Sequence, residues 1–153
     1  MKDAQEKVDK VAKKPAASDK EQMVNEYASE LRPLIGRLME NKDDLLTLIN
    51  VGVEDPALLS SYEYQDTAQL ICDEIQRNVE EVRAIGAQED ELGSIHLLAL
   101  KGAGELEFVA QNFPFAVEIS DTDLLLECAQ SFEKAGTFMD QATINLDKLS
   151  EEF

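Results

Sequence analysis

The stretch that indicates the fold most clearly spans residues 120–150 and reads SDTDLLLECAQSFEKAGTFMDQATINLDKLS. Its apolar side chains recur at intervals that alternate between three and four residues, so they share one face of an α-helix. The same alternation is the period of a left-handed helical bundle. The face consists of Leu125, Cys128, Phe132, Ala135, Met139, Ala142, Leu146 and Leu149.

Three earlier stretches show related apolar patterns. The spacing predicts helices over about residues 19–50, 60–86 and 89–112. Pro33 lies inside the first stretch, where we expect a kink rather than a break. Short links between successive helices favour antiparallel neighbours. The sequence therefore predicts an all-α protein, an up-down-up-down antiparallel four-helix bundle over residues 21–153.

The expected helix ends depend on capping and breaking residues. Ser60 followed by Glu63 has the pattern of a capping box at the start of the second helix. Pro114 is expected to end the third helix, because proline removes a backbone donor. Ser120 or Asp121 then begins the fourth.

Residues 1–20 have a different character from the rest of the chain. Their charges alternate in sign without enough apolar side chains to bury. The sequence Pro-Ala-Ala-Ser at residues 15–18 is expected to break any helix there. We therefore expect a disordered, flexible, charged tail or linker ahead of the bundle.

The third predicted helix carries a group of small residues at its middle. Glycine inside a helix costs about 0.5–1 kcal/mol relative to alanine, so the group needs a reason. We expect close approach by a neighbouring helix, with Phe132 as the facing bulky side chain. A ligand cavity at this level is the alternative. The group consists of Ala99, Gly102, Ala103 and Gly104.

The chain is strongly acidic. Its 153 residues include 32 Asp and Glu against 14 Lys and Arg, for a net charge of −18. Six of the lysines lie in residues 1–22, so the acidic excess belongs to the bundle. Such a surface repels nucleic-acid phosphates and anionic lipids, which excludes both as partners. The charge keeps the domain soluble, or it serves binding to a basic protein or nucleic-acid mimicry.

Metal and thiol chemistry find little support. A di-iron bundle site needs Glu-x-x-His pairs, but the residue three positions before His96, the one histidine, is Gly93. His96 borders an apolar face and is expected to be a hydrogen-bonded structural residue, with haem ligation as the alternative. Cys72 and Cys128 are expected to be free and buried, with a disulfide as the alternative. We expect no cofactor, no metal site and no enzymatic activity.

The two longer links are apolar and are expected to lie at the same end of the bundle. Residues 113–119 alternate as an extended segment would. The two links either cap the core or form an exposed patch that a partner covers. The candidate partner interface consists of Val53, Leu58, Leu59, Phe113, Phe115, Val117 and Ile119.

Residues 85–98, IGAQEDELGSIHLL, join the second and third predicted helices. This hinge, followed by acids, a leucine and a histidine, resembles that of Firmicutes-type cell-envelope lipoproteins with a four-helix domain of unknown function. The rhythm of Ala129, Phe132, Ala135 and Met139 is similar too. The resemblance implies that residues 1–20 are the spacer between a lipid anchor and an extracytoplasmic domain without known catalysis.

The leading functional hypothesis is a non-catalytic, extracytoplasmic binding module tethered to the cell envelope. It would bind an unidentified protein partner, insert no residue into the membrane, and exist as a monomer or weak dimer. If Met1 is the native start, we expect a cytoplasmic protein. The first alternative is then a cytoplasmic acidic regulator or nucleic-acid mimic that binds a basic protein. The second alternative is a cofactor- or ligand-binding helical bundle.

Crowded carboxylates lead to an expectation about pH. On so acidic a domain they are expected to hold protons more readily in the folded than in the unfolded state. A group with a raised folded-state pKa contributes stability that is lost as pH rises. We therefore expect the Tm to rise as pH falls from 7 to mildly acidic values, and with added salt at pH 7. A fall of the Tm in circular-dichroism melts on mild acidification would show that specific ion pairs dominate.

Overall fold

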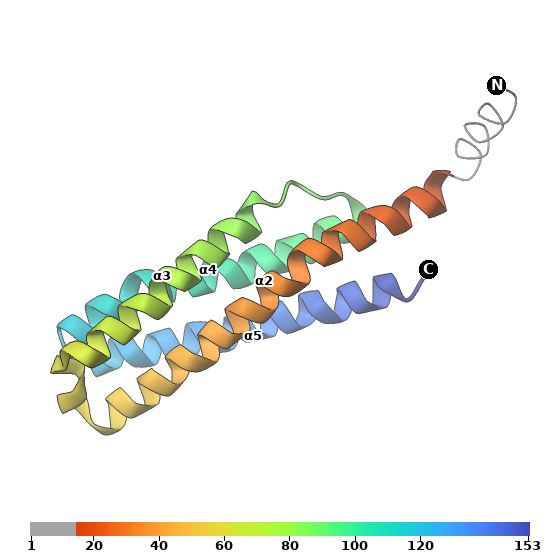
Figure 1. Ribbon diagram of the computed structural model, residues 1–153. Helices are drawn as coiled ribbons and strands as arrows, with labels where there is room; N and C mark the ends of the chain where they lie inside the picture. Colours follow the sequence, from red (N-terminus) through yellow and green to blue (C-terminus); the bar gives the residue numbers. More distant parts are fainter. Residues whose placement is uncertain (1–14) are drawn as a thin grey trace, which may run out of the picture.

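The computed structural model describes residues 15–153, with side chains from Asp19 onward. This part of the chain forms four α-helices and one short 3-10 helix, so the predicted all-α, four-helix class is confirmed. The helices lie side by side in an elongated bundle (Figure 1). The elements are α2 (Pro15–Glu54), η1 (Pro56–Ser60), α3 (Tyr62–Ala84), α4 (Asp90–Glu118) and α5 (Thr122–Ser150).

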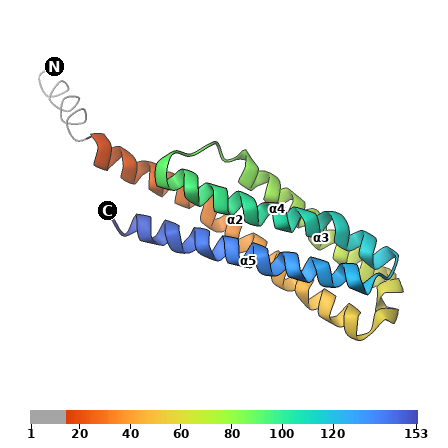
Figure 2. The ribbon, with the colours of Figure 1, turned by 180° about the vertical axis from the view of Figure 1, so that it is seen from behind.

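Each helix has two main neighbours. Both α2 and α4 pack against α3 and α5, and α4 with α5 forms the most extensive contact. The α2–α3 and α4–α5 links lie at one end of the bundle, whereas the α3–α4 link and the C-terminus lie at the other (Figures 1 and 2). The two apolar links therefore share an end, as the sequence predicts.

The core follows the predicted apolar faces. All eight members of the α5 face are buried, with relative exposures of 4% or less. Around them, α4 contributes Ala99, Ala103 and Leu106, each fully buried. Because these faces meet along the whole length of the helices, the core is one continuous cluster rather than separate patches.

The small residues of α4 divide into two groups. A Cβ atom at Gly102 would lie 2.8 Å from Cε and 3.0 Å from Cγ of Met139, so Gly102 admits a close neighbour. The expected close packing is confirmed here, but the facing side chain is Met139 rather than Phe132. The Met139 side chain occupies the space beside Gly102, where the alternative hypothesis placed a ligand cavity. Gly104 differs, because a Cβ there would meet nothing within 4 Å.

The start of the first helix differs from the prediction. Helix α2 begins at Pro15, so residues 15–18 are helical and do not break the helix. Proline is tolerated at a first helical position, where its missing N–H has no intrahelical acceptor. The predicted tail of residues 1–20 thus loses residues 15–20 to α2, while residues 1–14 lie outside the described part. Helix α2 then runs through Pro33 without a break, as expected.

Two other predicted boundaries shift. Residues 56–60 form the 3-10 helix η1, so the cap of α3 is Ser61 rather than Ser60, and its hydroxyl accepts from the Tyr64 N–H at 3.5 Å. Helix α4 continues to Glu118 with Pro114 inside it, so the predicted stop before Pro114 is wrong. Interior proline costs about 3 kcal/mol. Burial of Phe113 and Val117, at roughly 1.5–3 kcal/mol each, offsets that cost.

The α4–α5 link is a tight helix ending that passes directly into a cap. The Asp121 N–H donates to the Ala116 carbonyl at 2.9 Å and the Ser120 N–H to the Val117 carbonyl at 3.2 Å, the hydrogen bonds of a Schellman motif. Asp121 also caps α5 by accepting from the Leu124 N–H at 3.1 Å. Ser120, at φ 53°, occupies the left-handed position where glycine is favoured.

This geometry predicts that Ser120→Gly stabilises the bundle. Glycine adopts the left-handed conformation without the Cβ clash that serine suffers there. We expect the free energy of unfolding to rise by about 0.5–1 kcal/mol, measured by urea denaturation. Ser29→Gly, the same chemical change in the interior of α2, is the matched control and should lower it by a similar amount. A loss of stability in Ser120→Gly would contradict the proposed strain.

Candidate protein-interaction surface

The seven predicted interface residues fall into two groups. Phe115 and Ile119 are about half exposed, at 53% and 50%, and Val53 and Leu58 are about one-third exposed. The other three are buried in the core and cannot contact a partner in the folded state, so the prediction is wrong for them. They are Leu59, Phe113 and Val117.

The helical period of α4 explains much of this division. An extended segment would place residues 113, 115, 117 and 119 on one side, but the segment continues the helix to Glu118. Phe113 and Val117, four residues apart, then face the core. Phe115 faces outward between them. Apolar residues alternate in this segment because both the inner and the outer side of the last turns of α4 are apolar, and not because the segment is extended.

The short helix η1 is fixed to the core by Leu59. A Cβ atom at Gly52 would lie 2.7 Å from both Leu59 Cδ2 and Tyr64 Oη, so a larger residue there would displace one of these side chains. The Tyr64 hydroxyl donates to the Leu48 carbonyl, and Gln65 Nε2 donates to the Leu59 carbonyl at 2.9 Å. With Leu59 buried, its neighbour Leu58 turns partly outward.

The structure adds one exposed residue that the sequence reasoning missed, Tyr62, which is 84% exposed. Val51, which belongs to the same apolar link as Val53, is 38% exposed. The available signal for Tyr62 was its position at the first turn of α3, outside the apolar face. We define the apolar pole as the exposed side chains at this end of the bundle, namely Val51, Val53, Leu58, Tyr62, Phe115 and Ile119.

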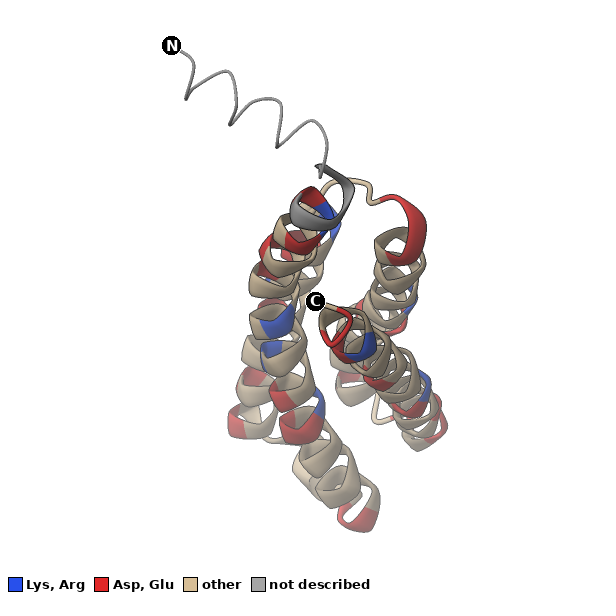
Figure 3. Cartoon of the chain, turned by 90° about the vertical axis from the view of Figure 1, so that its right-hand side faces the viewer, with Lys and Arg blue, Asp and Glu red and all other residues tan. Residues whose placement is uncertain are grey.

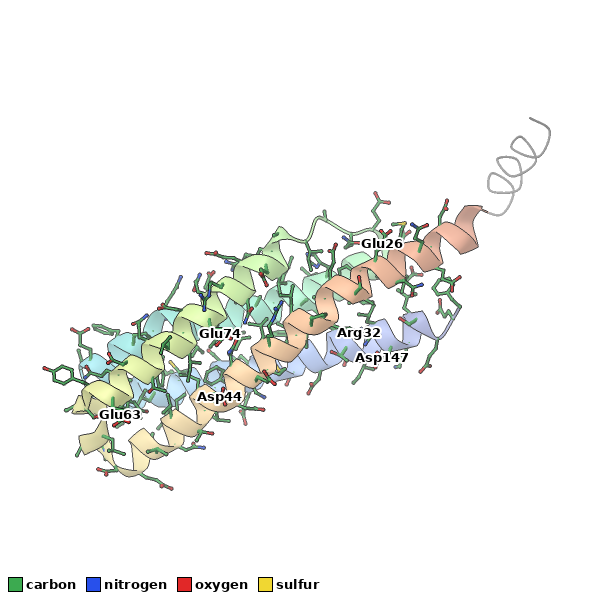
Figure 4. All side chains as sticks on the ribbon, in the orientation of Figure 1. Glu26, Arg32, Asp44, Glu63, Glu74 and Asp147 are labelled. Atoms are coloured by element: carbon green, nitrogen blue, oxygen red, sulfur yellow. The ribbon has the colours of Figure 1, made fainter. Side chains whose placement is uncertain are left out.

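The apolar pole is surrounded by acids. Residues 43–76 and 102–133, which include this end of the bundle and extend beyond it, contain no Lys or Arg. Acidic side chains predominate over basic ones along the helices (Figure 3), and Glu63 lies at the pole itself (Figure 4). The basic side chains that form ion pairs lie away from it, such as Arg32, whose Nη1 is 2.6 Å from Asp147 Oδ1 (Figure 4). The pole therefore combines apolar side chains with uncompensated negative charge.

Two buried polar pairs lie elsewhere and are structural. Asn78 Nδ2 donates to Asn41 Oδ1 at 2.9 Å, joining α3 to α2. Towards the opposite end from the pole, the Tyr27 hydroxyl and His96 Nδ1 are hydrogen-bonded at 2.9 Å, with the rings edge to face. Every buried side-chain N or O atom in residues 19–153 has a hydrogen-bond partner. The expected structural role of His96 is consistent with this contact.

The two cysteines are free and buried, as predicted. Burial raises the pKa of Cys72 and of Cys128 to about 12, so both remain thiols at neutral pH. A thiol is a weak nucleophile and a poor metal ligand. No group of three or more His, Cys, Asp and Glu in the described part of the chain is placed to hold a metal ion.

A groove lies between α2 and α5. It has a volume of about 380 Å³ and a mostly apolar lining, with Lys42 at its edge. The Lys42 side chain is 22% exposed, and its ammonium lies 3.6 Å from Asp43 Oδ1. The apolar lining includes Leu46, Leu126, Ala129 and Phe132.

Comparison with protein families, with curated proteins and with solved structures finds no match for this chain. None of the helices between residues 15 and 153 has the length and apolar character needed to cross a membrane. The four helices, the net charge of −18 and the apolar pole define an acidic four-helix protein with exposed apolar side chains at one end.

Specific ion pairs oppose the pH dependence expected from bulk charge. The hydrogen bond from Lys20 lowers the pKa of Glu91, and the hydrogen bond from Arg83 lowers the pKa of Glu107. A carboxyl with a lowered folded-state pKa contributes stability that is lost as pH falls. Both pairs are at least partly exposed, so each contributes little.

His96 gives a sharper prediction. Burial lowers its pKa below 6.5, while the backbone carbonyl of Ile85 acts in the opposite direction. Below about pH 6.5 the imidazole of His96 therefore takes up a proton in the unfolded chain more readily than in the folded chain. The free energy of unfolding decreases as the pH is lowered through this range. We expect the stability advantage of the wild type over His96→Gln to shrink below pH 6.5, by at most about 1.4 kcal/mol per pH unit. Urea denaturation at pH 7.5 and 5.5 measures it, and a constant difference would contradict the prediction.

Proposed function

We propose that this chain is a non-catalytic helical interaction module that binds a protein partner through the apolar pole. The observation that carries the proposal is the group of six exposed apolar side chains at one end of a strongly acidic bundle. Exposed apolar residues scattered singly are normal, but a group at one end indicates a contact surface. Tyr62 and Phe115 are of the aromatic type that is enriched in such contacts.

The charge around the pole indicates the chemistry of the partner. A surface that offers apolar side chains within a cation-free, acidic end is complementary to apolar residues flanked by Lys or Arg. The carboxylates would accelerate encounter, and the apolar side chains would hold the complex. We propose that the four helices run up-down-up-down and antiparallel, which the positions of the links at alternate ends support. This arrangement presents both apolar links to one partner.

The resemblance of residues 85–98 to envelope lipoproteins supports a location outside the cytoplasm, tethered through the N-terminal segment. The intact mass of the protein from its native cells tests this part. A lipid-modified cysteine ahead of Met1 is the expected result. An unmodified chain that begins at Met1 contradicts it.

An unmodified chain would favour the second candidate, a cytoplasmic acidic regulator that competes with nucleic acid for a basic protein. The net charge of −18 favours this candidate. Its signature is displacement of DNA from the basic target in a binding assay. Moderate salt should abolish that displacement, because it screens exposed charges beyond about 8–10 Å.

Substitution at the pole tests the interaction directly. We expect Leu58→Ser with Ile119→Ser to abolish retention of a partner by the immobilised protein, because both substitutions remove apolar side chains that the pole exposes in part. Helicity by circular dichroism should remain unchanged, and stability should fall by no more than about 1–2 kcal/mol per site, because each side chain is only partly buried. Quantitative mass spectrometry of proteins retained from native cells provides the readout.

The matched control is Leu70→Ser, which removes a 69% exposed leucine from the outer side of α3, away from the pole. It should retain the same proteins as the wild type. Equal loss in the control would show non-specific adhesion instead of a defined surface. Unfolding of the double variant would show that the pole residues cap the core.

A further inference from the structure

The outer face of α4 carries a second apolar feature, separate from the core. A helix at the surface of a bundle normally exposes a polar face. Here Leu97 and Phe115 are each 53% exposed and Phe108 is 38% exposed. We define the outer stripe of α4 as the residues along this side, namely Leu97, Lys101, Gly104, Phe108, Gln111 and Phe115.

Gly104 has no role within the bundle that explains it. At Gly102 a Cβ would collide with Met139, but at Gly104 it would meet nothing within 4 Å. Glycine in a helix interior costs about 0.5–1 kcal/mol relative to alanine, and this cost brings no packing inside the protein. A glycine on an open helix surface does permit the close approach of a side chain or helix from outside. Phe108 lies one turn away on the same stripe.

We infer that α4 pairs with α4 of a second copy of this chain, antiparallel, with Phe108 of each copy packed against Gly104 of the other. The intervals along the outer stripe are four, three, four, three and four residues, which read the same in both directions. A twofold axis at the middle of the stripe therefore places each position opposite another member of it. The opposed residues are Leu97 with Phe115, Lys101 with Gln111, and Gly104 with Phe108.

The contacts are self-complementary in shape. Each large side chain at the ends, Leu97 or Phe115, meets the other large one, while the aromatic ring of Phe108 meets the residue without a side chain. The same patch serves both copies, as an isologous dimer interface requires.

The distribution of charge also favours a second copy at this surface. Two chains of net charge −18 repel one another, so they can meet only where carboxylates are few. Residues 92–104 of α4 contain no Asp or Glu, and the outer stripe itself contains none. Glu105 borders the stripe, and Glu107 is bonded to Arg83. Association should therefore strengthen with salt, in contrast to partner binding at the acidic pole.

Sedimentation equilibrium over a series of concentrations tests the pairing. We expect the wild type to dimerise, and more tightly at 0.5 M than at about 0.05 M NaCl, where the Debye length is well above 10 Å. Gly104→Gln fills the space that the partner's Phe108 would occupy, and Phe108→Ser removes the aromatic ring that would occupy it. Each should raise the dissociation constant of the dimer at least about tenfold, or about 1.4 kcal/mol.

Two matched variants isolate the effect. Gly36→Gln makes the same change at another helical glycine whose Cβ would meet nothing within 4 Å, on α2. Leu70→Ser removes an exposed leucine from α3. Both should leave the dissociation constant unchanged. A wild type that stays monomeric at all concentrations and both salt levels overturns the inference, as does an equal effect of Gly36→Gln and Gly104→Gln.

Cross-linking tests the antiparallel register. Copies carrying Lys101→Cys, mixed with copies carrying Gln111→Cys, should be joined by a short bismaleimide, and neither variant should cross-link with itself. The native Cys72 and Cys128 do not compete, because they are buried and burial raises the pKa of each to about 12. Self-cross-linking of Lys101→Cys would indicate parallel pairing and overturn the register.

The two surfaces can be tested separately, because they share only Phe115, which none of these variants changes. Loss of dimers in Gly104→Gln with partner retention intact would support the pairing alone. Loss of partner retention in the pole variant with dimers intact would support the proposed function alone.

Discussion

Met139 of α5 lies directly against Gly102 of α4, where a Cβ atom would lie 2.8 Å from the methionine Cε, so a larger residue would force the Met139 side chain to move. This contact belongs to the interface of α4 with α5, which is the most extensive helix–helix interface of the bundle. Ala99 and Ala103, both fully buried, continue the close approach along α4. Because α4 also packs against α3, the position of three helices depends on this one region of small side chains. Protein interiors are closely packed, so a bulkier residue there would displace neighbours instead of filling a void.

The polar interactions of the interior are few and complete. Asn41 with Asn78 joins α2 to α3, and Tyr27 with His96 joins α2 to α4. A single buried polar pair contributes little net stability, but an alternative helix alignment would leave its atoms without partners, at a cost of about 1–3 kcal/mol each. Such pairs therefore select one alignment of the helices over others that bury the same apolar area.

The surface combines two opposing tendencies. A large negative charge keeps copies of the chain apart and favours basic partners, while apolar side chains remain exposed at one end and along the outer side of α4. Salt weakens the first effect and leaves the second almost unchanged. Added salt should therefore weaken the binding of a basic protein at the apolar pole and strengthen the pairing of two acidic copies along α4. The salt dependence of binding distinguishes the two contacts.

The sequence by itself determined the helical class and the buried face of α5, including Cys128, because the 3.6-residue period is a local property that apolar spacing records directly. It misplaced the end of α4 and the cap of α3, and it named Leu59, Phe113 and Val117 as candidate interface residues while leaving open that the links cap the core, as these three do. In a helix with apolar residues on both sides, spacing alone does not tell which side faces the core. Only the tertiary structure decided that α4 continues through Pro114, since burial of its last turn offsets the cost of the proline. It also decided that Met139 faces Gly102, because such a contact depends on how two helices separated along the chain align.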